Sequence, residues 1–473
     1  MAKENIAKGD VMIGLECHVQ LDTVSKLFCG CPTKAEEPNS ACCEVCLGFP
    51  GSKPVLNKKA LDYALKVALA LNCEINTEFF FSRKTYFYPD MSKSFQITQY
   101  EVPVGKNGIV TLSSGKKIRI QRIHIEEDPA ALIHESGLSS SQNTLVDYNR
   151  SGIPLIEVVT APDLVNPQEA RDFLDQLTTI LNYLKVFDLQ EGTLKVDSNI
   201  SLAGGKRVEV KNITGKKGVE KALAFEAVRQ KGILLKGGEV LMETRAFNEK
   251  TFTTMSMRAK ETEADYGYIF EPDLPAFELD NDYLAAVKKE LPELHDLKAR
   301  RFSEEYGLDE YTSGVLASNP LLGQLFEEIS KEVDAKLAAK FTSRELLAIS
   351  NYNNIPLEKM DIAVKELVAL LQLLESGKVS EKNAKQALIK YVLEKVSPTS
   401  YIEQEGLAKD LDEGKVNEAI EKVIAENEQA VADFKAGGEK ALNFLVGKVM
   451  QETRGKADAR ALQKILAEKL RGD

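Results

Sequence analysis

The chain has 473 residues, too many for a single hydrophobic core, so two or three domains are expected. Its composition, 43% hydrophobic and 28% charged, is that of a soluble globular protein, and its net charge of −11 argues against a general nucleic-acid coat. No apolar run approaches the roughly 20 residues that span a membrane, and the first residues lack the apolar core of a signal peptide. These features predict a cytoplasmic protein without membrane association.

The first predicted element is a strand over Ile13–Leu21. Apolar and polar residues alternate along it, so one face packs on a core and the other presents Glu16 and His18. A carboxylate and an imidazole two residues apart on one strand face converge on one volume, as metal binding or proton transfer requires. The alternative is an amphipathic strand whose polar side faces solvent.

Five of the seven cysteines follow within 18 residues. Cys29 and Cys31 form one pair and Cys43 and Cys46 another, and each pair can direct two thiolates to one tetrahedral ion. Disulfides are rare in reducing compartments, so this spacing favours a structural zinc site over coincidental thiols. Cys42 could replace Cys43 as a ligand.

Asn57 is a predicted N-cap for a helix that runs to about Asn72. Bases and aromatic residues then interleave over Arg83–Asp90, a pattern that can hold phosphates or stack a base. A sheet edge covered by aromatic residues is an equal alternative. The segment Arg258–Asp273 has the same character, and we expect it to line the same cleft.

A second predicted strand, Ile118–Ile125, runs into three consecutive acids. His124 and Glu126 share one face of this strand, whereas Glu127 lies on the opposite face unless a bulge intervenes. Adjacent acids repel one another, and a bound cation relieves the repulsion. A solvated turn is the alternative. Further strands are predicted over 145–150 and 153–159, and Asn166 caps the helix that follows.

The segment Gly192–Asn212 is a predicted hairpin. Matching apolar residues sets Leu202 opposite Val208 and Ile200 opposite Val210, with a three-residue loop over 204–206. Acids and bases interleave on the polar face, which suits a phosphate–metal site, although solvated sheet faces share the pattern. The residues of this polar face are Lys195, Asp197, Asn199, Glu209 and Lys211.

From about Pro292 the sequence becomes helical. Ser343 is a predicted cap for a helix over 344–350, a second helix spans 362–375, and Ser380 begins a third. Residues 401–433 hold ten acids and three bases, a net charge of −7, whereas residues 434–473 hold nine bases and five acids, a net charge of +4. This basic terminus indicates a nucleic-acid contact or a partner surface, with a solvated helix face as the alternative.

Together these segments resemble the B subunit of tRNA-dependent amidotransferases of the GatCAB type. The motifs that carry the resemblance are Ile13–Val19, Arg83–Asp90, His124–Asp128, Val146–Arg150, Asp197–Ile200 and Phe444–Gly447. The resemblance implies an α+β fold: a glutamine-synthetase-like, mixed or antiparallel β cradle (residues 1–292, including the cysteine pairs), an all-α domain (293–398) and a small helical, tRNA-binding tail (399–473). It also implies a heterotrimer with an amidase A subunit and a C subunit.

The implied activity is ATP-dependent phosphorylation of the side-chain carboxylate of misacylated Glu-tRNA(Gln) or Asp-tRNA(Asn), followed by amidation with ammonia from the A subunit. Family similarity places six residues around Mg²⁺ and nucleotide: Glu16, His18, Glu126, Glu127, Asp197 and Glu209. Of these, the expected magnesium ligands are Glu16, His18, Glu127 and Glu209. The phosphate partners that we add from charge and strand face are Arg83, Lys84, Lys195 and Lys211.

The sequence leaves two alternatives to this function. A tRNA-docking scaffold without catalysis would explain the basic tail, but it leaves the clustered acids unexplained. The archaeal E-type paralogue performs the same chemistry, but it carries a large inserted domain for which this chain has no room.

Overall fold

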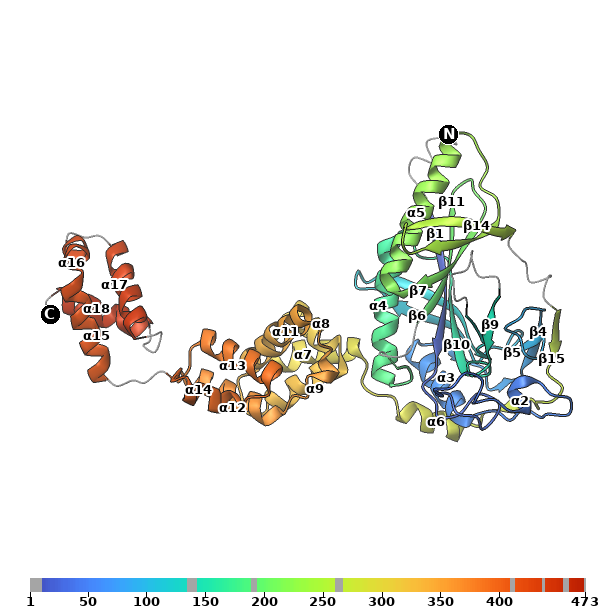
Figure 1. Ribbon diagram of the computed structural model, residues 1–473, viewed down its shortest axis with the longest axis horizontal. Coiled ribbons are helices and arrows are strands. Elements are labelled where there is room, and N and C mark those ends of the chain that lie inside the picture. The colour runs from blue at the N-terminus through green and yellow to red at the C-terminus, as the bar shows by residue number, and fades with distance from the viewer. Residues whose placement is uncertain are drawn as a thin grey trace. The chain divides into compact units, whose positions relative to one another are not determined.

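The computed structural model describes residues 11–133, 143–188, 194–259, 267–408, 413–435, 439–453 and 459–471. The chain divides into two compact units, Met1–Leu294 and His295–Asp473. The first unit is built on strands and the second on helices (Figure 1). This confirms the predicted α+β class, and the division lies two residues beyond the predicted end of the strand-rich region.

A nine-stranded sheet, ordered β14-β13-β12-β11-β1-β10-β7-β6-β2, forms the centre of the first unit. Neighbouring strands of this sheet are antiparallel except for β12 and β13. The strands are β1 (Val11–Gln20), β2 (Glu74–Ile75), β3 (Glu78–Phe79), β4 (Ser82–Thr85), β5 (Phe95–Thr98), β6 (Gly105–Thr111), β7 (Lys117–Glu127), β8 (Ala131–Ile133), β9 (Leu145–Asp147), β10 (Pro154–Thr160), β11 (Lys195–Leu202), β12 (Val208–Thr214), β13 (Glu243–Asn248), β14 (Thr253–Ala259), β15 (Gly267–Phe270) and β16 (Phe277–Glu278). The helices are α2 (Glu44–Leu47), α3 (Lys58–Ala70), α4 (Pro167–Leu184), α5 (Gly215–Leu235) and α6 (Asn281–Lys289).

The predicted first strand is the middle strand of this sheet. Ile13, Leu15, Cys17 and Val19 of β1 are almost fully buried, because helices α3, α4 and α5 cover that face of the sheet (Figure 1). Side chains alternate between the two faces of a strand, so the intervening polar residues of β1 project to the other face. The amphipathic pattern of the sequence therefore fixes which face of the sheet carries the polar side chains.

Both helix starts that the sequence predicts in this unit are confirmed. The Asn57 side chain accepts hydrogen bonds from the backbone of Lys59 and Ala60 at the start of α3, and Asn166 accepts one from Glu169 at the start of α4. These bonds satisfy amides that have no partner inside the helix. The predicted strand over 153–159 is also confirmed, as β10.

The predicted register of the hairpin is wrong by two residues. In the structure Ile200 pairs with Val208, and Ser198 pairs with Val210. A shift of two residues keeps the same side chains on each face, so the hydrophobic pattern cannot distinguish the two registers. The longer loop that results turns at Gly204, whose φ of +91° lies in the left-handed region that glycine tolerates.

The second unit consists of helices. They are α7 (His295–Tyr306), α8 (Glu310–Ala317), α9 (Pro320–Ile329), α10 (Ala335–Lys340), α11 (Leu347–Asn353), α12 (Val364–Glu375), α13 (Glu381–Glu394), α14 (Pro398–Gln404), α15 (Glu413–Glu426), α16 (Glu428–Lys435), α17 (Glu439–Glu452) and α18 (Ala459–Arg471). The predicted start of α13 at Ser380 is confirmed, since its side chain accepts from Asn383 N. None of the described helices is long and apolar enough to cross a bilayer.

The predicted helix start at Ser343 is wrong. Residues 335–353 are helical without a break, and Ser343 lies inside a π-helical segment, Phe341–Leu346, between α10 and α11. The helix is capped at Asp334 instead, whose side chain accepts from Leu337 N. Phe341 is buried in the core of this unit, so tertiary packing overrides the local cap signal.

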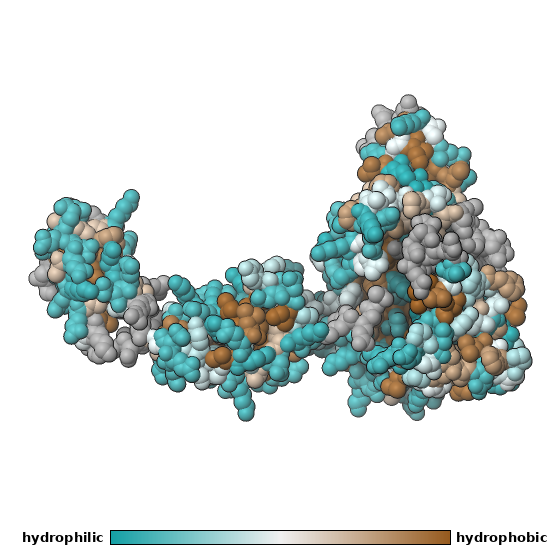
Figure 2. Space-filling view, viewed as in Figure 1, coloured by the Kyte–Doolittle hydropathy of each residue, from teal (hydrophilic) through white to brown (hydrophobic). Residues whose placement is uncertain are grey.

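The helical unit contains two hydrophobic clusters, one over residues 302–402 and one over residues 420–470. The second cluster joins helices α15 and α16, which lie in the acidic stretch, to helices α17 and α18, which lie in the basic stretch. Ion pairs connect the two pairs of helices: Lys422 lies 3.2 Å from Glu452, and Lys469 lies 3.1 Å from Glu421. The charge change near residue 434 therefore falls inside one packed bundle, whose visible surface is mainly hydrophilic (Figure 2).

Candidate functional site

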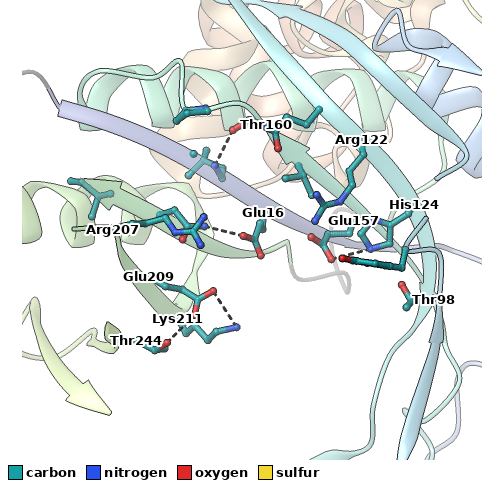
Figure 3. Close-up of a pocket in the computed structure, with 18 of the residues that line it drawn as sticks. Glu16, Thr98, Arg122, His124, Glu157, Thr160, Arg207, Glu209, Lys211 and Thr244 are labelled. Carbon is teal, nitrogen blue, oxygen red and sulfur yellow. Dashed lines mark hydrogen bonds and ion pairs between the residues drawn. The ribbon is translucent and has the colours of Figure 1, made fainter. Parts of the chain in front are cut away.

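The open face of the sheet carries two adjoining cavities of about 920 and 570 Å³. The five residues that line both are charged: Glu16, Lys84, Glu126, Glu157 and Lys211. Four of them come from β1, β7, β10 and β12 of the nine-stranded sheet, and Lys84 comes from β4 of a three-stranded sheet. Figure 3 shows several of these side chains projecting from the sheet into the larger cavity. The structure therefore concentrates charge where the cavities meet.

Three carboxylates converge at this place: Glu16, Asp197 and Glu209 each offer an oxygen, and these atoms lie within 4.8 Å of one another. The β1–β11 register sets Glu16 directly beside Asp197. Asn199 Nδ2 donates to Glu16 Oε1 at 2.9 Å, and Lys211 Nζ lies 2.8 Å from Asp197 Oδ2. The actual register of the hairpin places Glu209 beside Asn199 and so brings it into this group.

The group carries more negative than positive charge. Burial raises the pKa of Glu16, and the negative charges of Glu157, Glu209 and Asp197 raise it further, against the effect of Lys211. Burial alone would lower the pKa of Lys211, but Asp197 and Glu209 outweigh it and raise that pKa. One lysine among three carboxylates leaves a surplus of oxygen donors, which is the ligand chemistry that Mg²⁺ prefers. The residues present therefore fit a magnesium ion.

A second cluster lies beside the first. Glu157 Oε2 lies 3.1 Å from His124 Nε2 and 3.6 Å from His18 Nε2, and His124 Nε2 lies 3.4 Å from Glu126 Oε2. Burial by itself would lower the pKa of each histidine, but the adjacent glutamates raise both to about 9. Both glutamates in turn have lowered pKa values, because the histidines offset the effect of burial. Two imidazolium–carboxylate contacts thus share one carboxylate, that of Glu157.

Sequence reasoning missed Glu157. It stands in the otherwise apolar run Pro154–Val159 and lies opposite both His18 and His124 in the sheet. A single acid inside a buried strand was the available signal, because an ionised carboxylate is rarely buried without a partner. Two arginines that line the larger cavity, Arg122 and Arg207, were also not chosen as phosphate partners.

Glu127 is not brought together with the other predicted metal ligands. As the alternation of β7 predicts, it lies on the opposite face from Glu126. Its carboxylate makes an ion pair with Lys93 and accepts a hydrogen bond from Ile97 N at 2.9 Å. It lines neither of the two large cavities.

The predicted phosphate partners separate into two groups. Lys84 and Lys211 line both cavities, and Lys195 lines the smaller one. Arg83 instead makes two hydrogen bonds with the buried carboxylate of Glu271, at 2.7 and 2.9 Å. The expectation that the two aromatic-basic segments line one cleft is confirmed in part, since β4 pairs with β15 and Tyr268 lines the larger cavity, whereas residues 260–266 lie outside the described part.

A separate cluster is formed by Cys29, Cys31, Cys43 and Cys46, whose sulfur atoms lie within 4.8 Å of one another. Cys42 is directed elsewhere, with its Sγ 3.8 Å from Asn149 Oδ1. A hydrogen bond from Cys29 lowers the pKa of Cys46 to about 4, against the effect of burial. Four convergent sulfurs with a thiolate among them fit a tetrahedral zinc ion.

Lys26 supports this cysteine cluster from inside the protein. It is fully buried, and its Nζ lies 3.6 Å from Cys46 Sγ and 2.8 Å from Ala41 O. A buried lysine beside the Cys46 thiolate compensates its charge, because a charged group is rarely buried without a partner of opposite charge.

The fold and the site define a class: an α+β protein with an acid-lined sheet face, joined to a helical unit. The chain belongs to the GatB family. The model described as the GatB/GatE catalytic domain matches residues 11–285, and that described as the GatB domain matches residues 324–470.

Relatives of similar length support this assignment. The chain is 44% identical to the B subunit of the aspartyl/glutamyl-tRNA(Asn/Gln) amidotransferase from Methanosarcina barkeri, over 98% of each chain. It is 45% identical to the protein of the same name from Methanospirillum hungatei, over 97% of this chain and 98% of the relative. The protein of that name from Thermotoga neapolitana is 43% identical, over 98% and 99%. The resemblance noted from the motifs is thereby confirmed.

Proposed function

We propose that this chain phosphorylates and then amidates the side-chain carboxylate of Glu-tRNA(Gln) or Asp-tRNA(Asn), as the kinase and ligase subunit of a tRNA-dependent amidotransferase. The names of its relatives support the overall reaction. The observation that carries the proposal is the convergence of the Glu16, Asp197 and Glu209 carboxylates at the junction of the two cavities. A scaffold that only docked tRNA would have no need to collect buried acids there.

Glu16, Asp197 and Glu209 would hold Mg²⁺, and His18 with Glu157 and Glu126 forms a second group of donors beside them. When bound, the ion neutralises the charge of the triphosphate and of the substrate carboxylate. Glu127 is left out of this proposed ligand set, because its carboxylate is committed to Lys93.

The basic residues at the cavity junction would orient the phosphates. Lys84 and Lys211 reach both cavities, and Arg122 and Arg207 line the larger one. A substrate carboxylate oxygen attacks the γ-phosphorus of ATP, the bond from this phosphorus to the β–γ bridging oxygen breaks, and ADP leaves. Ammonia then attacks the acyl carbon of the acyl phosphate, the carbon–oxygen bond to phosphate breaks, and the amide forms.

The remaining parts of the proposal concern partners and cofactors. ATP and Mg²⁺ act in the cavities, and a structural Zn²⁺ is held by Cys29, Cys31, Cys43 and Cys46. Ammonia comes from an amidase A subunit in a heterotrimer with a C subunit, and helices α17 and α18 contact tRNA. We place the reaction in the cytoplasm, where the free thiols of this chain remain reduced.

The direct test combines the purified complex with each misacylated tRNA, ATP and glutamine, and follows ADP release and amide formation. The proposal predicts ADP release that depends on misacylated tRNA, with one amide formed per ADP. tRNA binding without ATP hydrolysis would favour the scaffold alternative.

A further inference from the structure

One carboxylate at the cavity junction is held by a hydroxyl from the neighbouring strand. Glu209 of β12 and Thr244 of β13 are direct neighbours in the parallel pair. Thr244 Oγ1 donates to Glu209 Oε2 at 2.9 Å, and Thr244 is only 2% exposed (Figure 3). On the other oxygen, Oε1, Glu209 faces Lys211 Nζ at 3.7 Å. The two oxygens of Glu209 therefore have different surroundings, and its side chain has little freedom to rotate.

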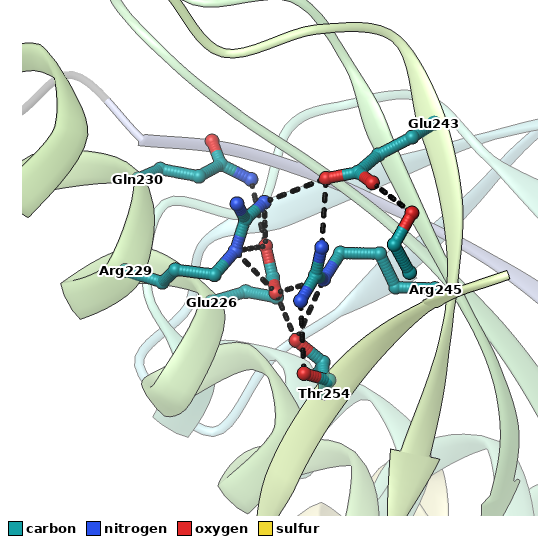
Figure 4. Close-up of polar contacts among 7 residues, drawn as sticks. Glu226, Arg229, Gln230, Glu243, Arg245 and Thr254 are labelled. Carbon is teal, nitrogen blue, oxygen red and sulfur yellow. Dashed lines mark hydrogen bonds and ion pairs between the residues drawn. The ribbon is translucent and has the colours of Figure 1, made fainter. Parts of the chain in front are cut away.

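The opposite face of β13 is fastened to α5. Arg245 follows Thr244 and so projects to the other face, where its Nε lies 3.1 Å from Glu226 Oε1. Glu226 has no exposed surface, and it also accepts hydrogen bonds from Arg229 at 2.9 Å and from Gln230 at 3.2 Å (Figure 4). We call the members of this network the Glu226 latch: Glu226, Arg229, Gln230, Glu243, Arg245 and Thr254.

The Glu226 latch is balanced in charge, in contrast to the cavity junction. It contains two glutamates and two arginines, and Arg245 also donates to Thr254 Oγ1 at 2.9 Å and to Thr254 O at 2.8 Å. These bonds tie β13 both to α5 and to the edge strand β14. A neutral network on the far face of the sheet contributes no net charge to the cavity. Its effect there is geometric, because it fixes the strand from which Thr244 projects.

We propose that Thr244 is a positioning residue that fixes the Glu209 carboxylate for metal binding, and that the Glu226 latch holds β13 in the register this hydrogen bond requires. The inference deepens the proposed function and rests on it, since it takes Mg²⁺ as the ion that Glu209 meets. A ligand held in place before the ion arrives loses less rotational freedom on binding. Hydrogen bonds to metal-binding carboxylates typically contribute 10- to 100-fold in metal affinity.

The test uses Mn²⁺ in place of Mg²⁺. Electron paramagnetic resonance measures the binding of Mn²⁺ to the full-length chain in the absence of substrates. Thr244→Val keeps the shape of the side chain and removes the hydroxyl, so it should weaken Mn²⁺ binding by about tenfold. Thr244→Ser restores the hydroxyl and should bind nearly as tightly as wild type. Thr111→Val, at an exposed position on β6 of the same sheet, is the matched control and should have no effect.

Turnover provides a second readout. Excess Mg²⁺ should return the Thr244→Val rate to near the wild-type value, so that the KM for Mg²⁺ rises while kcat is retained. A residue needed only for folding would instead lower the amount of active protein and leave the KM for Mg²⁺ unchanged. Thr244→Val that binds Mn²⁺ as wild type does, or Thr244→Ser that binds as weakly as Thr244→Val, would overturn the role of Thr244.

The latch is tested by Glu226→Gln, with Thr244 in place. We expect weaker Mn²⁺ binding together with a lower unfolding temperature. Unchanged Mn²⁺ affinity in Glu226→Gln would overturn the latch while the role of Thr244 stands. Failure of the proposed function looks different: wild type itself would then show no Mn²⁺ binding that depends on Glu16, and the inference would fall with it.

Discussion

Glu157 lies directly opposite His18 in the sheet, and its carboxylate also contacts His124, at 3.1 Å. Each histidine has a pKa raised to about 9, so both are protonated near neutral pH in the metal-free protein. Glu157 is thus the centre of a buried group in which one carboxylate serves two cations.

Replacing Glu157 with Gln should lower the stability of the metal-free protein in a pH-dependent manner. Both histidine pKa values lie above the ordinary 6.5 in the folded state, so their pairing with Glu157 stabilises the fold fully below about pH 6.5 and is lost as the pH rises through 9. Unfolding in denaturant, measured in EDTA from pH 6 to 9.5, should show a wild-type advantage that shrinks across this range. An advantage independent of pH would contradict the pairing.

The cysteine cluster should contain one zinc ion per chain. The double variant Cys31→Ser with Cys46→Ser should lose the metal and unfold at a lower temperature, because structural zinc contributes directly to folding. Elemental analysis of the purified protein gives the metal content. Cys42→Ser is the control, since its sulfur points to Asn149, and it should keep the zinc. Wild-type protein that is fully stable without metal would refute the assignment.

The basic terminus, residues 434–473, should bind tRNA and take no part in the chemistry. A truncation near residue 436 would cut through the hydrophobic core that α15–α18 share. The whole bundle is therefore better removed, by ending the chain at Ala408. We expect a higher KM for tRNA and a weaker dependence of binding on salt, while glutamine hydrolysis by the A subunit continues.

A milder version of this experiment leaves the bundle intact. Neutralising Lys448 and Lys464, both exposed, should reduce the salt slope of tRNA binding by about two, or one for each lost phosphate contact. The same change at Lys365 and Lys382, exposed on earlier helices, is the control. Unchanged tRNA affinity in the tail variants would assign the tail to packing or subunit contact.

Adjacent cations on β4 should have different roles. Lys84→Ala should raise the KM for ATP, because Lys84 lines both cavities. Arg83→Ala should instead lower the unfolding free energy by about 3 kcal/mol, since it leaves the buried Glu271 without its main partner. Steady-state kinetics and denaturant unfolding of the two variants separate the effects. A raised KM for ATP in Arg83→Ala at unchanged stability would reverse the assignment.

The sequence predicted which face of a strand each side chain occupies better than it predicted which strands pair with one another. Alternation alone placed Glu16 and His18 on the polar face of β1 and separated Glu126 from Glu127. It could not find the hairpin register, because a shift of two residues conserves both faces. It also could not show which acids meet, since Glu157 reaches His18 only through a pairing between strands that are more than a hundred residues apart.

The charge of a residue predicted its role less well than the alternation of apolar and polar residues predicted its strand face. Arg83 and Lys84 are both basic and adjacent, yet one is bound by Glu271, which comes from a distant segment. The change of charge near residue 434 marked a boundary in the sequence but not in the structure, because hydrophobic residues on both sides pack together. In both cases the decisive contact is tertiary and leaves no local signal.

The measurement that tests the central claim most directly is ADP release by Glu16→Gln in the presence of misacylated tRNA. This change keeps the shape of the side chain and removes the charge that the ion would meet. Loss of one ligand from a metal-assisted phosphoryl transfer is expected to cost several kcal/mol, which is about a hundredfold or more in rate. Glutamine hydrolysis by the A subunit should continue, and Glu78→Gln, exposed on β3, should behave as wild type. If Glu16→Gln released ADP and formed amide at nearly the wild-type rate, the polar face of β1 would be merely solvated and the metal-site assignment would be contradicted.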